Sequence, residues 1–312
     1  MRSRLEALTD ELRRLRAAGT AQVFVSDETL KNLHAAAARF RQPVGEPEAM
    51  TAPEEDFSMP TEVAAPTPRV RTASPTADGG VGLRWDGKPI APIPEPPVVE
   101  LPQGTKAEQM AWLRERVLNC PVCLAHVRPG RKLAFGVGTE QAEIFFCGEG
   151  PGADEEQQGE PFVGPAGQLL TRIIQAMGLT REKVYIGNIM KWRPEMPTDW
   201  GNREPTPAEV AFSLPFLRAQ LAIVKPQVIV ALGKTALNGL LGPDPRRKMT
   251  STRGKWLEFA GTPLMPTFHP SYLLRNSAMS VKRQVWEDMM KVMERVGMPV
   301  SEKQKGFFLG GR

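Results

Sequence analysis

EIFFCGEGPGADEEQQGEPFVGPAGQLLTRIIQAMG, residues 143–178, joins three segments of different character. It begins with an apolar run of strand length, EIFFCG (143–148), and ends with an amphipathic run of helix length, AGQLLTRIIQAMG (166–178). Between these runs lies a loop rich in glycine and carboxylates. A strand followed by such a helix is typical of a βαβ unit, in which the loop lies at the carboxyl end of the strand.

The same alternation continues through the rest of the chain. Runs rich in apolar, β-branched or aromatic residues have strand length at KVYIGNIM (183–190), QVIVALG (227–233) and PLMPTF (263–268). Stretches of helix length occupy 205–224, 234–241 and 280–297. We therefore predict an α/β protein with a three-layer α/β/α architecture, in which a four-stranded parallel sheet lies between two layers of helices.

Ligands of parallel sheets bind beyond the carboxyl ends of the strands, so the residues there are candidates for function. The acidic loop follows the first strand, Asn188 lies at the end of the second, Gly233 follows the third and His269 follows the fourth. Carboxylates at an open strand end can orient or deprotonate water, bind a metal or form the wall of a pocket. An acidic surface loop without chemistry is the alternative interpretation.

Part of the loop matches the glycine spacing of a dinucleotide-binding motif. Gly148-x-Gly150-x-x-Ala153 has the required spacing. However, Pro151 interrupts the turn, the acidic residues 154–156 would repel a pyrophosphate, and helical periodicity starts only near Gly164. A nucleotide cofactor is therefore disfavoured.

Proline marks the domain organisation. Thirteen of the 30 prolines fall between Pro43 and Pro102, which predicts a disordered linker over 43–104. The other predicted divisions are an N-terminal helical segment at 1–42, one folded domain at 105–298 and a flexible C-terminal tail at 299–312. A heptad-like stripe in the N-terminal segment (Leu5, Leu8, Leu12, Leu15) is compatible with docking or self-association, or with a single helix of a monomer.

Charge and cysteine content limit the class of protein. Residues 121–312 contain 25 basic and 18 acidic side chains, which makes a polyanionic partner reasonable. Five of the basic residues lie in RRKMTSTRGK (246–255). No signal peptide or membrane span is evident in the sequence, so we expect a cytoplasmic, nucleoid-associated protein without a membrane partner. Three cysteines do not suggest a disulfide framework.

Six motifs together carry a family resemblance. In order they are GEGPGADEEQQGEPFVGPAGQLL, VYIGNIMKWRP, NREPTPAEV, IVALGKTAL, RGKW and PTFHPSYLLR. This set resembles the type-4 uracil-DNA glycosylases, bacterial and archaeal repair enzymes best known for an iron–sulfur cluster. The resemblance implies hydrolysis of the N-glycosidic bond of deoxyuridine in DNA, which releases uracil and leaves an abasic site. A catalytically weak or inactive DNA-binding relative is the alternative.

The resemblance assigns roles to three pocket residues. Phe162 matches the aromatic that stacks on the flipped base. Asn188 matches the amide that accepts from uracil N3–H and donates to O4, a pattern that cytosine reverses. His269 matches the His-Pro-Ser histidine, which would donate to uracil O2 as the base departs. Taken alone, these residues could equally be a core Phe, a turn-forming Asn and a structural His.

The resemblance also assigns roles to other residues of the first motif, but it leaves open which carboxylate has which role. Glu149 and Glu155 match carboxylates of the family motif. Glu155 is expected to form the wall of the uracil pocket, and Glu149 is expected either to orient the attacking water or to order the loop. Gly150 and Gly152 are expected to let the backbone approach the base. What rejects the C5 methyl of thymine is left open.

The same resemblance places DNA contacts after the fourth strand. SYLLR corresponds to the DNA-penetrating loop, so Ser271 lies in the contact region, Leu273 or Leu274 is the candidate wedge and Arg275 is expected at a phosphate. The first turn of a helix with two core leucines is the alternative. Arg253 and Lys255, with the rest of the basic cluster, would contact the DNA backbone.

The cysteines depart from the family pattern of four cluster ligands. Cys120 and Cys123 supply the first pair, but Trp192 and Ser213 stand where the other two cysteines are expected. We therefore expect no 4Fe–4S cluster, or at best a partial and labile one. Cys120, Cys123 and His126 have a spacing that could bind zinc with a fourth ligand. Trp192 suggests that packing has replaced the metal.

The C-terminal tail contains QKGFF (304–308), which loosely resembles the peptides by which repair enzymes attach to sliding clamps. Phe307 and Phe308 would be the anchors. We expect a monomer that acts on uracil-containing DNA.

Overall fold

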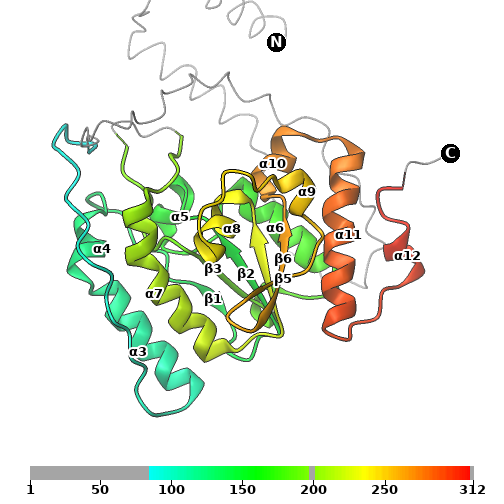
Figure 1. Cartoon of the computed structure of the whole chain (residues 1–312), viewed down its shortest axis with the longest axis horizontal. Helices are drawn as coiled ribbons and strands as arrows, with labels where there is room; N and C mark the ends of the chain where they lie inside the picture. Colours follow the sequence, from blue (N-terminus) through cyan, green and yellow to red (C-terminus); the bar gives the residue numbers. More distant parts are fainter. Residues whose placement is uncertain (1–83, 197–200, 310–312) are drawn as a thin grey trace, which may run out of the picture. The chain divides into compact units, whose positions relative to one another are not determined.

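A six-stranded sheet with the order β1-β3-β2-β4-β6-β5 forms the centre of the computed structural model, which describes residues 84–196 and 201–309 (Figure 1). These residues belong to one compact unit, residues 64–312. The strands are β1 (Val137–Gly138), β2 (Ile144–Gly148), β3 (Tyr185–Asn188), β4 (Val228–Leu232), β5 (Leu257–Phe259) and β6 (Thr262–Thr267). The four inner strands are parallel, and β1 and β5 are antiparallel edges.

Alternation along the strands produces two hydrophobic cores, one on each face of the sheet. In β2, Phe145 and Cys147 belong to one core, whereas Ile144 and Phe146 belong to the other. The first core is covered by α3 (Lys106–Leu118), α4 (Pro121–Ala125), α7 (Pro207–Val224) and α8 (Lys234–Leu241). The second is covered by α6 (Pro165–Ala176) and α11 (Met279–Arg295). The predicted three-layer architecture is confirmed.

Local sequence explains where the longer helices begin. Thr105 and Thr206 cap α3 and α7, and each forms a reciprocal capping box with the glutamate three residues later, Glu108 and Glu209. Such a cap contributes about 1 kcal/mol to helix stability. Pro165 and Pro207 occupy first-turn positions, where no backbone N–H is required.

Short elements are what the sequence pattern failed to predict. The edge strands β1 and β5 have two and three residues, too few for a recognisable period. The acidic loop, expected to be non-helical before Gly164, contains the helix α5 (Ala153–Gln158). Its first turn carries three acidic residues, which favour a helix amino terminus and so account for part of the acidity of the loop. The remaining short helices are η1 (Arg181–Lys183), α9 (Met249–Thr252), α10 (Pro270–Arg275) and α12 (Glu302–Lys305).

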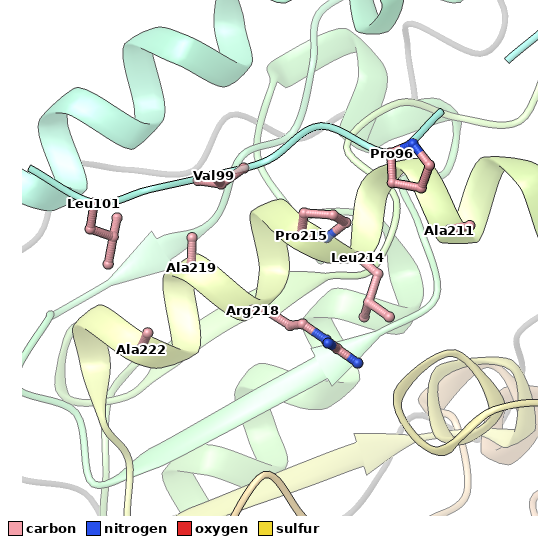
Figure 2. Close-up of a pocket in the computed structure, with 9 residues that line it drawn as sticks. All are labelled: Pro96, Val99, Leu101, Ala211, Leu214, Pro215, Arg218, Ala219 and Ala222. Carbon is pink, nitrogen blue, oxygen red and sulfur yellow. The ribbon is translucent and has the colours of Figure 1, made fainter. Parts of the chain in front are cut away.

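The last part of the predicted linker packs on the domain. Ile93, Val99 and Leu101 contact the first hydrophobic core, so the folded unit begins before the predicted boundary at 105. Figure 2 shows this segment lying along α7, with a cavity of about 520 Å³ between them. Its lining is mainly apolar: Pro96, Val99, Leu101, Ala211, Leu214, Pro215, Arg218, Ala219 and Ala222. Prolines keep the segment extended, and its alternate side chains supply the contacts.

The end of the chain also packs on the domain, in contrast to the predicted flexible tail. Trp286 Nε1 of α11 donates to Gln304 O at 2.6 Å, and Gln304 Nε2 donates to Ala176 O of α6 at 2.8 Å. Phe307 lies against Trp286, with ring centroids 5.3 Å apart, and both Phe307 and Phe308 pack on the second core. A clamp-binding peptide would first have to release these contacts.

Some predictions concern residues outside the described part of the chain. The N-terminal helical segment with its leucine stripe, and the linker up to residue 83, fall there, as do residues 310–312. Among the described helices, α7 alone is long and apolar enough to span a membrane, and 56% of it is buried inside the domain, as in the core helix of a soluble protein.

Candidate active site

Two neighbouring strand ends form the floor of the site. Gly148 ends β2 and Asn188 ends β3, and the two residues are paired in the parallel register. A Cβ atom on Gly148 would overlap Asn188 Oδ1 and would lie 2.5 Å from Phe162 Cζ. The amide and the aromatic ring therefore meet over Gly148, because that residue has no side chain. The motif resemblance pointed to the later glycines and not to this one.

Asn188 places an unsatisfied acceptor at this floor. The residue is 1% exposed, and its Oδ1 has no hydrogen-bond partner among the described residues. A buried carbonyl oxygen without a donor is unfavourable by about 1–3 kcal/mol. A ligand that offers an N–H group would remove this cost, so the site is suited to a base with a protonated ring nitrogen.

Phe162 forms one side of the pocket from a strained position. Its ring is buried and lies 5.7 Å from the His269 ring, with 32° between the ring planes. Its φ is +56°, a left-handed conformation that is uncommon for a residue with a large side chain. Gly167 allows this backbone to pack on α6, since a Cβ there would overlap the Phe162 carbonyl group.

His269 faces Phe162 and has one defined tautomer. It is the N-cap of α10, where its Nδ1 accepts the backbone N–H of Ser271 at 3.1 Å. Because the Nδ1 lone pair is used, the neutral ring carries its proton on Nε2. Burial first and the charge of Arg275 second lower the pKa of His269 to about 4. At neutral pH the residue is therefore a neutral Nε2–H donor.

The carboxylates of the first motif have different surroundings, and Glu149 lies at the end of a buried strand. It follows β2 directly, and burial raises its pKa, an effect opposed by a hydrogen bond with Thr235. Glu155 was expected at the pocket wall, but its two oxygens accept three backbone N–H groups, those of Gly152, Val163 and Gly164. Glu156 pairs with buried Arg193 at 2.8 Å.

Gly150 and Gly152 lie against other side chains, and neither lies against the Phe162 ring or the Asn188 amide. A Cβ on Gly150 would lie 3.0 Å from Met190 Cβ, and one on Gly152 would lie 2.6 Å from Glu155 Oε2. Gly152 leaves space for the Glu155 carboxylate that caps α5. The close approach of backbone to base at these two positions stays a prediction; Gly148 is the glycine over which the amide and the ring meet.

The structure divides the predicted DNA contacts into accessible and internal groups. Leu273 is 5% exposed and packs inside the domain as the helix alternative expected, whereas Leu274 is half-buried and Arg275 is exposed. Ser271 serves His269, because its hydroxyl lies 2.9 Å from His269 Nδ1. Two accessible residues therefore remain in this segment as candidates for DNA contact.

The two named members of the basic cluster also differ. Arg253 is directed inward: its Nε donates to Asp288 Oδ2 at 3.0 Å, and one terminal nitrogen donates to both Asp288 Oδ1 and the Gln284 carbonyl. Lys255 is exposed and accessible to a phosphate. Arg253 therefore holds α11 against the end of β6, while Lys255 remains a candidate for DNA binding.

A buried lysine beneath the site was not predicted from the sequence. Lys191 is fully buried, and its ammonium donates to Asn188 O at 2.8 Å, Gln220 Oε1 at 2.6 Å and Phe135 O at 3.3 Å. Burial lowers the pKa of Lys191 to about 7, although three acceptors match the three donors of an ammonium group. The contact to Asn188 O fixes the end of β3. No periodic pattern could have indicated that this charge is internal.

The residues at the four cluster positions do not fit a 4Fe–4S cluster, which takes four thiolates. Trp192 is fully buried and its ring stacks on His126, with centroids 5.3 Å apart. Ser213 is also fully buried. No group of three or more His, Cys, Asp or Glu side chains able to hold a metal occurs within residues 84–196 and 201–309.

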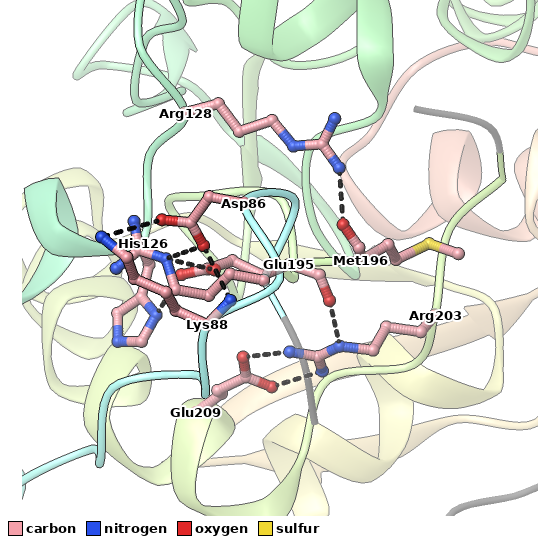
Figure 3. Close-up of polar contacts among 9 residues, drawn as sticks. Asp86, Lys88, His126, Arg128, Glu195, Met196, Arg203 and Glu209 are labelled. Carbon is pink, nitrogen blue, oxygen red and sulfur yellow. Dashed lines mark hydrogen bonds and ion pairs between the residues drawn. The ribbon is translucent and has the colours of Figure 1, made fainter. Parts of the chain in front are cut away.

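A polar network surrounds His126, the residue whose ring stacks on Trp192. Figure 3 shows this network. His126 Nδ1 donates to buried Glu195 at 2.8 Å, and Arg84 Nε lies 3.2 Å from the other Glu195 oxygen. Arg203 connects this network to α7, because it donates to Glu195 O at 2.7 Å and pairs with Glu209 at 2.6 Å. Ring packing and ion pairs thus link the segments that a metal cluster would otherwise join.

A double variant tests this conclusion. We expect Cys120→Ala/Cys123→Ala to change the rate of catalysis at this pocket by less than about twofold, because loss of thiol packing affects stability more than distant chemistry. Iron in the purified wild-type protein, measured by emission spectrometry, should be far below one atom per chain. Iron near four atoms per chain, absent from the variant together with activity, would contradict it.

The fold and the site define a base-binding pocket at the carboxyl ends of parallel strands. The family model of the uracil DNA glycosylase superfamily matches residues 135–290, which contain every pocket residue described above. Among similar proteins, the type-4 uracil-DNA glycosylase of Thermotoga maritima is 43% identical over 60% of this chain and 94% of its own length. That of Archaeoglobus fulgidus is 35% identical over 64% of this chain and 98% of its own length. This chain belongs to the uracil-DNA glycosylase superfamily and, within it, to the type-4 family.

Proposed function

We propose that this protein is a DNA repair enzyme that hydrolyses the N-glycosidic bond of deoxyuridine, releasing uracil and leaving an abasic site. The observation that carries this proposal is the unsatisfied Asn188 Oδ1, which meets the Phe162 ring over Gly148, with the His269 ring on the same aromatic at 5.7 Å. A flipped uracil offers the N–H, the flat face and the carbonyl oxygen that these three groups require. The reaction takes place in the nucleoid, on uracil-containing DNA.

Recognition of the base rests on Asn188 and Phe162. The Asn188 carbonyl accepts from uracil N3–H and its amide donates to O4, whereas cytosine presents an acceptor and a donor at these positions. Phe162 stacks on the ring and supports a base removed from the helix. A buried amide that is left unpaired by the wrong base discriminates more strongly than shape alone.

Cleavage needs charge stabilisation on both fragments. As the bond between C1′ and N1 breaks, negative charge develops on uracil O2. His269 Nε2–H stabilises this charge by donating a hydrogen bond, and the histidine keeps its proton. Glu149 orients water toward the cationic C1′ and accepts its proton. Water supplies hydroxide to C1′, and the one proton released to Glu149 passes on to the departing uracil anion, so that neutral uracil and an abasic sugar are formed.

DNA is held by accessible residues around the pocket. Lys255 and Arg275 are exposed, and we assign them to phosphate contacts, with Leu274 as the residue that enters the space left by the base. Binding through phosphates should weaken as the salt concentration rises, more steeply the more phosphates the protein neutralises.

Cleavage of a single-uracil oligonucleotide tests the function. We expect the wild-type protein to produce alkali-sensitive sites, and Asn188→Ala to lower kcat/KM by about 10²-fold, because an acceptor and a donor to the base are removed. Asn119→Ala, at the exposed end of α3, is the matched control and should leave kcat/KM unchanged. Salt-sensitive DNA binding without cleavage by the wild-type protein would instead favour a catalytically inactive DNA-binding relative.

A further inference from the structure

The loop that carries Phe162 is held from one side by an arginine outside the catalytic motifs. Arg181, in η1, donates from one terminal nitrogen to Phe162 O at 3.0 Å and from the other to Pro161 O at 2.9 Å. The first of these nitrogens also lies 3.3 Å from the hydroxyl of Thr171 in α6. A planar guanidinium is suited to such paired acceptors, since its donors have fixed directions.

The following two residues of the loop are held from the other side by a carboxylate. Glu155 Oε1 accepts the N–H groups of Val163 and Gly164, each at 2.9 Å. Four successive residues, 161–164, therefore have backbone groups fixed by two opposite charges. Burial lowers the pKa of Arg181, and the nearby carboxylates of Glu160, Glu182 and, to a smaller extent, Glu155 oppose this effect.

This arrangement acts where the backbone is least able to keep its own conformation. Phe162 has φ +56°, and a non-glycine residue in this region persists only when its surroundings enforce it. The ring leaves the backbone at the strained residue itself. A change in φ at Phe162 would therefore rotate the ring away from Asn188 and His269, and not only loosen the loop.

We propose that Arg181 is a positioning residue for base excision: together with Glu155 it fixes the left-handed backbone of Phe162, so that the ring stands ready to stack on the flipped base. The proposal rests on the proposed function and adds a residue whose effect is transmitted through Phe162. Glu155, expected to form the pocket wall, acts in the same way from the opposite side.

A double-mutant cycle tests this role under single-turnover conditions on a single-uracil duplex. We expect Arg181→Met to lower the excision rate by about 10- to 100-fold, because a displacement of about 1 Å in a positioned group can cost this much. In a Phe162→Ala background the same substitution should lower the rate by less than about twofold, since the ring through which Arg181 acts is absent. Arg181→Lys keeps the positive charge but loses the paired donors of the guanidinium group, so its excision rate should lie between those of the wild type and Arg181→Met.

Arg283→Met provides a matched control. Arg283 likewise donates to two backbone carbonyls, those of Lys305 and Phe307, but these lie in the C-terminal segment. It should lower the thermal unfolding midpoint without lowering the excision rate at about 25 °C, because the two carbonyls that it binds lie in the C-terminal segment and not in the loop of Phe162. If Arg181→Met does not fold, Arg181→Lys and its combination with Phe162→Ala complete the cycle.

The outcomes separate the inference from the proposed function. If the wild-type protein leaves uracil DNA intact, the proposed function fails. If the wild-type protein is active and Arg181→Met lowers only the unfolding midpoint, or lowers the rate equally with and without the Phe162 ring, Arg181 is structural and the inference is overturned.

Discussion

Replacing His269 with alanine is expected to lower kcat for uracil excision by about 10²–10³-fold, with a much smaller change in KM. The donor acts on charge that develops only as the glycosidic bond breaks, so its removal affects the transition state more than substrate binding. Steady-state and single-turnover rates on a single-uracil oligonucleotide measure this effect. His269→Gln, which retains an N–H donor, should recover part of the rate.

The ionisation state of His269 gives this prediction a second observable. NMR titration of the three histidines of the chain should find one with a pKa of about 4, absent in His269→Ala. If the neutral ring is the donor, activity should not increase as pH falls through about 6.5, the ordinary histidine pKa. A rate that rises with protonation in that range would contradict the neutral-donor assignment.

The sign of the stability effect follows from the same lowered pKa. Between pH 6.5 and about 4 the unfolded chain binds a proton at this position and the folded chain does not. The contribution of His269 to the free energy of unfolding is therefore constant above pH 6.5 and decreases as pH falls toward 4. Denaturant unfolding of wild type and His269→Ala at about pH 7 and about pH 5 measures the difference.

Gly148→Ala is expected to reduce kcat/KM by about 10²-fold or more while the protein still folds. The added methyl would overlap Asn188 Oδ1 and lie 2.5 Å from Phe162 Cζ, so the amide, the ring or both must move. Because both groups contact the same base, a single methyl group should impair recognition and stacking together. Circular dichroism and single-turnover excision distinguish this outcome from global unfolding.

A matched glycine variant defines what the methyl itself does. Gly306 has φ −78°, which any residue adopts, and a Cβ there would meet Lys303 O at 3.3 Å. Gly306→Ala should therefore keep wild-type activity. If Gly148→Ala cleaves uracil DNA at the wild-type rate, Gly148 does not form the floor of the pocket that binds the base.

The inner strands and the pocket residues at their ends could be predicted because they depend on local patterns. Buried parallel strands produce continuous apolar runs, and connections between them place the strand ends at one edge of the sheet. Asn188 and His269 were found from these rules and from the motif resemblance. The edge strands, α5 and the docked 93–101 segment could not be found, since each is short and depends on contacts with distant residues.

Residue type and spacing were sufficient to predict the chain order of the inner strands and longer helices and the family of the chain. The replacement of two cluster cysteines by Trp192 and Ser213 stays a prediction from the motif resemblance. Which charged groups are available for chemistry depends instead on contacts between segments far apart in the chain. In the sequence, Glu155 cannot be distinguished from Glu149, nor Arg253 from Lys255, by residue type and position in a motif. In the structure, Glu155 accepts backbone N–H groups and Arg253 pairs with buried Asp288. The reason is physical: a charged group is less available to a ligand when partners inside the protein already satisfy it, as three backbone amides satisfy Glu155 and Asp288 satisfies Arg253.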